Sequence, residues 1–157
     1  MPAWINNQQN RFRIPRKNLS QTAELILDAL GSPDAELSVV ILGAQEMTAL
    51  NRQYLERDYP ANVMAFPMRE GPDADLNPGL LGDVVICADT AKKEAEAAKV
   101  PFSHRLRELL IHGTLHLMGH DHAEPGETAR MEAEEARLLA LAKEAGKSRK
   151  ANADFAD

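Results

Sequence analysis

The sequence predicts a single α+β (α/β) domain, in which a small mixed sheet of about four strands packs with about five helices. The chain has 157 residues, which suits one domain and buries about two-thirds of the unfolded surface. Short runs rich in β-branched residues alternate with stretches of helical hydrophobic spacing. We find no internal repeat or linker in the sequence, so these elements are expected to share one core.

The first third of the chain predicts strand, helix and strand. AWINN, residues 3–7, is a short strand candidate. Residues 15–30 carry apolar side chains at helical spacing, and Gly31 follows as a stop signal. The segment ELSVVIL, residues 36–42, is rich in β-branched residues and predicts a strand.

The middle of the chain returns to helical spacing and then to strands. Residues 43–56 predict a helix, and NVMAF, residues 62–66, predicts a short strand that Pro67 ends. Residues 68–80 are dense in turn-forming residues and predict a loop. GDVVICA, residues 82–88, predicts an apolar strand.

Three helices are expected in the last part, at residues 88–99, 103–119 and 127–146. Pro101 separates the first two, and Gly146 is the expected end of the third. The remaining segment, residues 147–157, lacks apolar density and is expected to be disordered. The predicted domain therefore spans residues 1–146.

Composition and charge narrow the class of protein. The chain is 44% hydrophobic and 27% charged, with a net charge of −6 and a pI near 5.4, so nucleic acid would have to meet a local basic patch. It has no apolar run long enough to span a bilayer and no apolar leader. The single Cys87 fits a reducing compartment. We expect a cytoplasmic protein without a membrane partner.

Four of the five histidines fall within HGTLHLMGHDH, residues 112–122. His112 and His116 are one helical turn apart, about 6 Å along the axis, so both can bind one metal ion from the same face. His122 would lie about 15 Å from His112 on a continuous helix. Gly119 is where the chain could turn back to bring His122 close. Three histidines plus water are typical of a catalytic zinc site, and we predict one Zn²⁺ per chain.

The neighbouring polar residues have more than one interpretation. His120 is off the ligand spacing and is expected to line or cap the site. Asp121 could orient a ligand histidine or simply cap a turn. Glu108 lies one turn before His112 and could support it or face solvent, and His104 is expected to be an ordinary surface histidine.

The same histidine spacing occurs in metzincin peptidases, whose motif is HExxHxxGxxH, so the predicted metal helix is zincin-like. The residue after the first histidine is Gly113 rather than glutamate. That glutamate is the general base of a peptidase, and glycine has no side chain to replace it. The spacing thus favours a metal site, while Gly113 argues against peptide hydrolysis.

The segment IHGTLHLMGHDH, residues 111–122, closely resembles HGxLHLxGxDH of the YbeY family of bacterial rRNA maturation factors. LNRQYLERDYPANVMAFP at 50–67 and LGDVVIC at 81–87 are similar to further family segments. The final helix, with Met131 and Glu135, also matches. The resemblance runs from about Trp4 to Ala145. It implies zinc held by the three ligand histidines, and a metal-dependent endoribonuclease selective for single strands. The implied role is 3′-end maturation of small-subunit (16S) rRNA and late ribosome quality control, with the small subunit and its assembly proteins as partners.

One departure from the family pattern bears on catalysis. Leu55 stands where the family has an arginine, and leucine offers neither charge nor donor. Ala61 and Ala65 likewise replace a threonine and a serine. Arg52 or Arg57 could supply the missing cation, or both could face solvent.

The mechanism is predicted only in part. Zinc would lower the pKa of a bound water and polarise a phosphoryl oxygen. With Gly113 in the place of the base, proton transfer would fall to Asp121, His120 or solvent. The basic segment RFRIPRK, residues 11–17, could help to hold RNA or could be a solvated helix start. The acidic stretch at 124–135 is expected to lie off the RNA path.

Two alternatives to a nuclease remain open from the sequence. The first is a ribosome-associated assembly factor with structural zinc and little catalysis, which Leu55 favours. The second is a metallopeptidase-like zinc hydrolase, which the histidine spacing favours and Gly113 opposes.

Overall fold

The computed structural model describes residues 3–68, 79–119 and 125–152. The elements in chain order are β1 (Ala3–Asn7), α1 (Arg16–Ala29), β2 (Glu36–Leu42), α2 (Ala44–Leu55), β3 (Val63–Pro67), β4 (Leu80–Cys87), α3 (Ala88–Ala98), α4 (Phe102–Leu117) and α5 (Pro125–Asn152). The α+β class and the small mixed sheet predicted from the sequence are confirmed. Most of the predicted loop at 68–80 lies outside the described residues.

The four strands form one sheet in the order β1-β2-β4-β3. β1, β2 and β4 are parallel, and β3 runs antiparallel to β4 at the edge of the sheet. Helical crossovers connect the parallel strands, as parallel pairing requires. β3 and β4 are also sequential strands, and the segment between them lies mainly outside the described residues.

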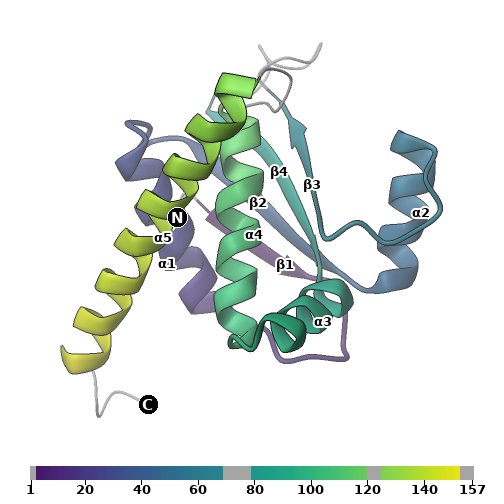
Figure 1. Ribbon diagram of the computed structural model, residues 1–157, viewed down its shortest axis with the longest axis horizontal. Helices are drawn as coiled ribbons and strands as arrows, with labels where there is room; N and C mark the ends of the chain where they lie inside the picture. Colours follow the sequence, from purple (N-terminus) through teal and green to yellow (C-terminus); the bar gives the residue numbers. More distant parts are fainter. Residues whose placement is uncertain (1–2, 69–78, 120–124, 153–157) are drawn as a thin grey trace.

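The two faces of the sheet are covered unequally (Figure 1). The larger core joins one face to α1, α3, α4 and α5, and the smaller core joins the other face to α2. α4 lies across the larger core, with Leu106, Leu110 and Leu115 fully buried. Burying a leucine side chain contributes about 2 kcal/mol, so α4 is held firmly on the sheet.

Helix α5 is longer than the sequence predicts. It continues to Asn152, six residues past the expected end at Gly146. Glycine inside a helix costs only about 1 kcal/mol relative to alanine, and the lysines, arginine and alanine after it favour helix. Residues 153–157 of the predicted tail lie outside the described residues.

Candidate metal centre

The last turns of α4 bring His112 and His116 together. Their rings meet at 67° with centroids 4.7 Å apart, and their Nε2 atoms are 3.2 Å apart. This is the i, i+4 adjacency that the sequence predicts.

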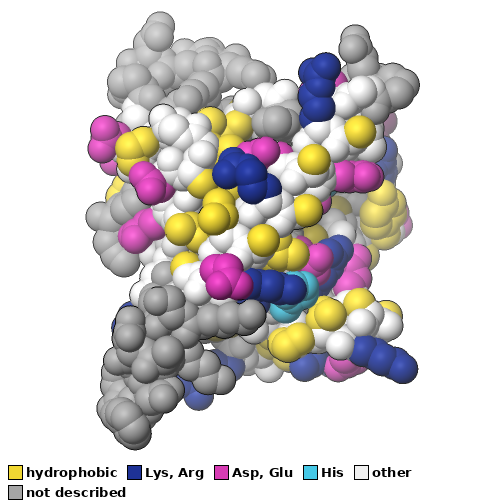
Figure 2. Space-filling model, turned by 60° about the vertical axis from the view of Figure 1, so that its left-hand side comes forward, with side chains coloured by type: hydrophobic (Ala, Val, Ile, Leu, Met, Phe, Trp, Pro, Cys, Tyr) yellow, Lys and Arg dark blue, Asp and Glu magenta, His cyan; other side chains and the backbone are white. Residues whose placement is uncertain are grey.

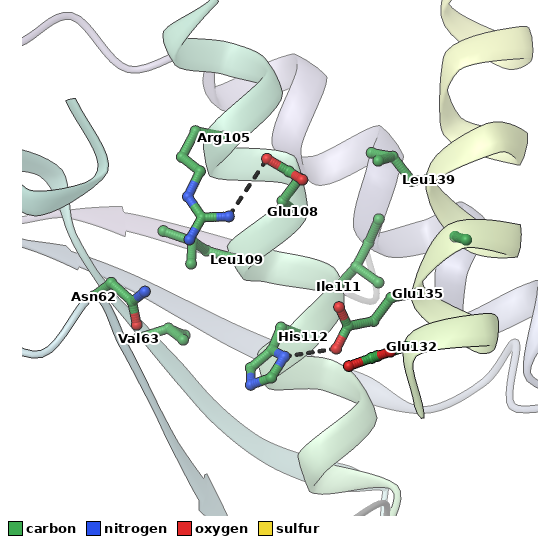
Figure 3. A pocket seen from close by; sticks show the side chains of 11 residues that line it. Asn62, Val63, Arg105, Glu108, Leu109, Ile111, His112, Glu132, Glu135 and Leu139 are labelled. Carbon is green, nitrogen blue, oxygen red and sulfur yellow. Dashed lines mark hydrogen bonds and ion pairs between the residues drawn. The ribbon is translucent and has the colours of Figure 1, made fainter. Parts of the chain in front are cut away.

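A carboxylate from α5 holds the ring of His112. Glu135 Oε1 lies 2.6 Å from His112 Nδ1, and Figure 3 shows this contact across the space between α4 and α5. An Nδ1–H that donates to Glu135 leaves the ring lone pair on Nε2, the nitrogen that faces His116. Carboxylates commonly orient metal-binding histidines in this way.

The two Nε2 atoms fit a tetrahedral metal ion. Zinc–nitrogen bonds of about 2.0–2.1 Å at a tetrahedral angle place two ligand nitrogens about 3.3 Å apart. The observed separation of 3.2 Å agrees with that value. The residues present therefore suit two adjacent positions on a zinc ion.

The third ligand expected from the sequence, His122, lies outside the described residues, together with His120 and Asp121. Within the described ranges, no group of three or more His, Cys, Asp or Glu side chains is arranged to hold a metal. Gly119, two residues beyond the end of α4, has φ +96°, a conformation that L side chains rarely adopt. The path of the chain from Gly119 to His122 lies outside the described residues, so the return of His122 to the histidine pair stays a prediction.

Gly113 is needed for close packing between α4 and the sheet. A Cβ atom at this position would lie 2.6 Å from Val84 Cγ1 and 3.2 Å from Val63 Cγ2. A side chain therefore could not enter without displacing one of these valines. The close contact between α4 and the sheet therefore leaves no space at Gly113 for the glutamate of a peptidase.

Two cavities meet at His112 and Val63, both of which line each cavity. The first, of about 420 Å³, lies between α4 and α5 and is drawn in Figure 3. Its charged lining residues are Arg105, Glu108, Glu132 and Glu135. We call it the acidic cavity, because three carboxylates face one guanidinium.

The second cavity, of about 540 Å³, includes His116 and lies along β3. Its other lining residues are apolar, aromatic or glycine: Tyr54, Leu55, Val63, Met64, Ala65, Phe66, Pro67, Gly113 and Gly119. We call it the apolar cavity. Apart from the histidines, none of its described lining residues carries a charge.

Leu55 lies beside the histidine pair, and Arg52 and Arg57, the two alternative cations, lie elsewhere. Leu55 lines the apolar cavity with both histidines and is 49% exposed. Arg52 pairs with Asp58 and lines a separate hollow on α2. Arg57 donates to the Tyr59 hydroxyl at 3.2 Å. Neither arginine is among the described residues of the apolar cavity.

The residue that supports His112 differs from the one considered from the sequence. Glu108 instead contacts Arg105 at 3.4 Å and His104 at 3.7 Å. Glu135 is 23 positions from His112, and no local spacing rule connects them. In the sequence, only the resemblance of the final helix to the family pointed to Glu135.

The acidic stretch at 124–135 comes close to His112, because Glu132 and Glu135 line the acidic cavity. Its position off the RNA path stays a prediction. One further expectation needs correction. His104 is not an ordinary surface residue, since only 13% of its side chain is exposed. Burial is the main cause of its lowered pKa, which Glu108 partly offsets.

The basic N-terminal segment has structural contacts away from the histidines. Arg11 forms an ion pair with Asp89 at 3.0 Å, and Arg16 donates to the backbone oxygen of Ile5 at 3.3 Å. Arg11 and Arg16 each line a surface hollow, and neither hollow includes His112 or His116. The structure therefore does not bring this segment to the histidine pair.

The surface over α5 mixes both signs of charge. In Figure 2, the described acidic and basic side chains are interspersed with apolar ones on the face turned toward the viewer. Ion pairs such as Glu127–Arg130 contribute to this pattern on α5.

None of the described helices is both long and apolar enough to cross a membrane.

Comparison with known proteins agrees with the fold and the sequence motifs. The family model "Endoribonuclease YbeY" matches residues 4–143. A protein of that name from Geobacter sulfurreducens is 51% identical over 93% of this chain and 99% of its own. One from Syntrophus aciditrophicus is 37% identical over 90% of this chain and 89% of its own. A Thermotoga maritima protein of known solution structure has a TM-score of 0.65 at 24% identity, with 93% of each chain covered, and supports the fold.

These relatives are named as endoribonucleases, the class of hydrolase that cleaves RNA within the strand. The chain belongs to the endoribonuclease YbeY family. The resemblance noted in the sequence is thereby confirmed.

Proposed function

We propose that this protein is a zinc-dependent endoribonuclease that cuts single-stranded RNA. The observation that carries the proposal is the pair of Nε2 atoms 3.2 Å apart, one of them on a ring held by Glu135. The chain belongs to an endoribonuclease family. A histidine pair with metal-ligand geometry would hold the metal ion that promotes RNA cleavage.

We assign the metal to His112, His116 and His122, with one zinc ion per chain. The first two fit on geometry, and His122 is assigned from its spacing in the sequence. When bound, zinc supplies Lewis acidity and brings the pKa of a water toward neutrality. The protein holds and orients the ligands, with Glu135 fixing the tautomer of His112.

The protein must also move a proton, and no side chain is available at Gly113. A Cβ there would contact Val84 at 2.6 Å, so this position cannot supply a base. We propose that His120 or Asp121, which follow the glycine turn in sequence, perform proton transfer. Arg52 and Arg57 remain weaker candidates for contacting phosphate, because neither lines the apolar cavity.

The charges around His112 favour one direction of approach for RNA. The acidic cavity has Glu108, Glu132 and Glu135 in its lining and would repel phosphates. The apolar cavity has no carboxylate among its described lining residues. We therefore propose that RNA reaches the metal along β3.

The family supports a more specific role for the activity. We propose that the substrate is the small-subunit (16S) rRNA precursor near its 3′ end, processed in the cytoplasm during late ribosome quality control. The small ribosomal subunit and its assembly proteins are the proposed partners.

Leu55 favours a second candidate, a ribosome-associated assembly factor whose zinc is structural. It places an uncharged side chain in the cavity of the histidines, where a cation would stabilise charge developing on phosphate. In that case zinc would be bound but RNA cleavage would be weak or absent.

One experiment separates these functions. Zinc-loaded and chelated protein are incubated with single-stranded RNA, with the same RNA as a duplex, and with casein. Zinc-dependent cutting of only the single strand is expected. Zinc binding without any cutting would favour the assembly factor, and cleavage of casein would favour a peptidase.

A further inference from the structure

The apolar cavity wraps around the outer edge of the sheet. β3 is an edge strand, since the order is β1-β2-β4-β3. Val63 and Ala65 pack on the larger core beneath α4, and Phe66 packs on the smaller core beneath α2. Because all three line the cavity together with the histidines, the cavity runs from one face of the sheet to the other.

The backbone of β3 directs hydrogen-bonding groups to this edge. Asn62 accepts a backbone hydrogen bond from β4 at 2.9 Å, and Met68 donates one to β4 at 3.1 Å. The register shows that these bonds join directly opposed residues, so the even-numbered residues of β3 point their N–H and C=O groups at β4. Val63 and Ala65 therefore direct theirs outward.

Tyr54 stands on the far side of this edge from the histidines. It is 56% exposed and lines the apolar cavity. Its ring meets Phe66 at 66° with centroids 5.1 Å apart. This edge-type contact fixes the ring while leaving much of it open to a planar ligand.

Exposure alone would not single out Tyr54, because isolated surface aromatics are common. Tyr59 is 49% exposed, yet it does not line this cavity, and Arg57 donates to its hydroxyl at 3.2 Å. Tyr54 differs in sharing a cavity with His112 and His116. It is therefore placed to touch whatever reaches the histidines.

The chemistry of the apolar cavity favours a nucleobase over a phosphate beside Tyr54. Among its described lining residues there is no lysine or arginine to attract phosphate. Aromatic stacking is the contact that every base can make, whatever the sequence. Binding energy beside the histidines would then come from stacking and from the backbone edge.

We propose that Tyr54 stacks on the base of a nucleotide neighbouring the scissile phosphate, while Val63 and Ala65 hydrogen-bond that nucleotide through their backbone. This inference rests on the proposed nuclease function and extends it to substrate recognition. A base within a duplex is paired and stacked and cannot reach the ring. Tyr54 thus supplies a physical basis for selecting single strands.

The test measures RNA affinity with zinc-loaded protein and short RNAs that each lack one base at a successive position. For wild type, one abasic position should weaken binding about 5- to 150-fold, the range for losing one stacked base. Tyr54→Ala should bind intact RNA weaker by a similar factor and show no further loss at that position. Tyr54→Phe should match wild type, because the ring is retained.

Tyr59→Ala is the matched control, since it removes a similarly exposed ring outside the apolar cavity. If Tyr54→Ala does not fold, Tyr54→Leu keeps an apolar contact with Phe66 without a planar ring. Wild-type affinity in the folded variant, or an abasic profile unchanged by it, would overturn the proposal. The profile depends on binding alone, so absence of cleavage by wild type would count against the nuclease and not against Tyr54.

Discussion

The two cavities that meet at His112 differ in charge, and the difference divides their roles. The acidic cavity presents Glu135 to Nδ1 of His112. The apolar cavity contains His116, whose Nε2 faces Nε2 of His112. The His112 imidazole therefore has Glu135 on one side and, on the other, the nitrogen that we propose as the metal ligand.

This arrangement separates ligand positioning from substrate access. Carboxylates near a metal strengthen a histidine ligand but repel a polyanion. With Glu108, Glu132 and Glu135 all in the acidic cavity, the proposed path of RNA runs through the apolar cavity. Variants on each side should therefore have distinct effects on zinc and on RNA.

The largest effect is expected on the apolar side, from His116→Ala. It removes a proposed ligand, so stoichiometric zinc should be lost, as measured by elemental analysis of protein purified without a histidine tag. The matched pair in the segment after Gly119 is His122→Ala, which should lower zinc, and His120→Tyr, which should leave it unchanged. Stoichiometric zinc in His116→Ala, or equal losses in the matched pair, would show that the ligands are misassigned.

A smaller effect is expected on the acidic side, from Glu135→Gln. Loss of the carboxylate that orients His112 should weaken zinc binding about 10- to 100-fold, the usual range for such partners. Competition with a chelator of known affinity measures this directly. Glu132→Gln removes a neighbouring carboxylate of the same cavity and should change zinc affinity little. Equal weakening in both variants would mean that general negative charge, rather than the contact with His112, matters.

Adding a cation to the apolar cavity should raise activity. Leu55→Arg restores a charge-assisted hydrogen bond to phosphate, and 1.4 kcal/mol of transition-state stabilisation corresponds to roughly tenfold in rate. Leu55 is 49% exposed, so the arginine need not be buried. Leu55→Gln controls for polarity without charge, and melting curves confirm the fold. Two results together would contradict this prediction: no gain in rate for Leu55→Arg, and undiminished cleavage by an Arg52→Ala/Arg57→Ala double variant. They would show that cleavage does not depend on a cation at these positions.

The sequence was most informative where structure is local. Helical periodicity placed His112 and His116 on one face, and Gly119 marked the end of that helix. Each predicted strand and helix is present within the described residues, with boundaries shifted by a few residues. The main exception is the C-terminal end of α5, where Gly146 does not terminate the helix.

Contacts between distant segments could not be read from the sequence. Glu135 reaches His112 only because α5 packs beside α4. The apolar cavity depends on β3 being an edge strand, a result of strand order rather than of local pattern. His112 therefore lines two cavities because of how distant segments pack together, which no local sequence pattern shows.

The smallest effect concerns His104, which borders the acidic cavity through Glu108, 3.7 Å away. Burial lowers the pKa of His104 below 6.5, with Lys143, Arg107 and Arg105 acting in the same direction and Glu108 opposing them. The unfolded chain therefore binds this proton more readily than the folded one, and stability should fall as pH drops through 6.5. Denaturant unfolding of metal-free protein at pH 7.5 and 5.5 should show a smaller loss for His104→Gln than for wild type. An identical loss in the two proteins would show that His104 does not contribute to the pH dependence of stability.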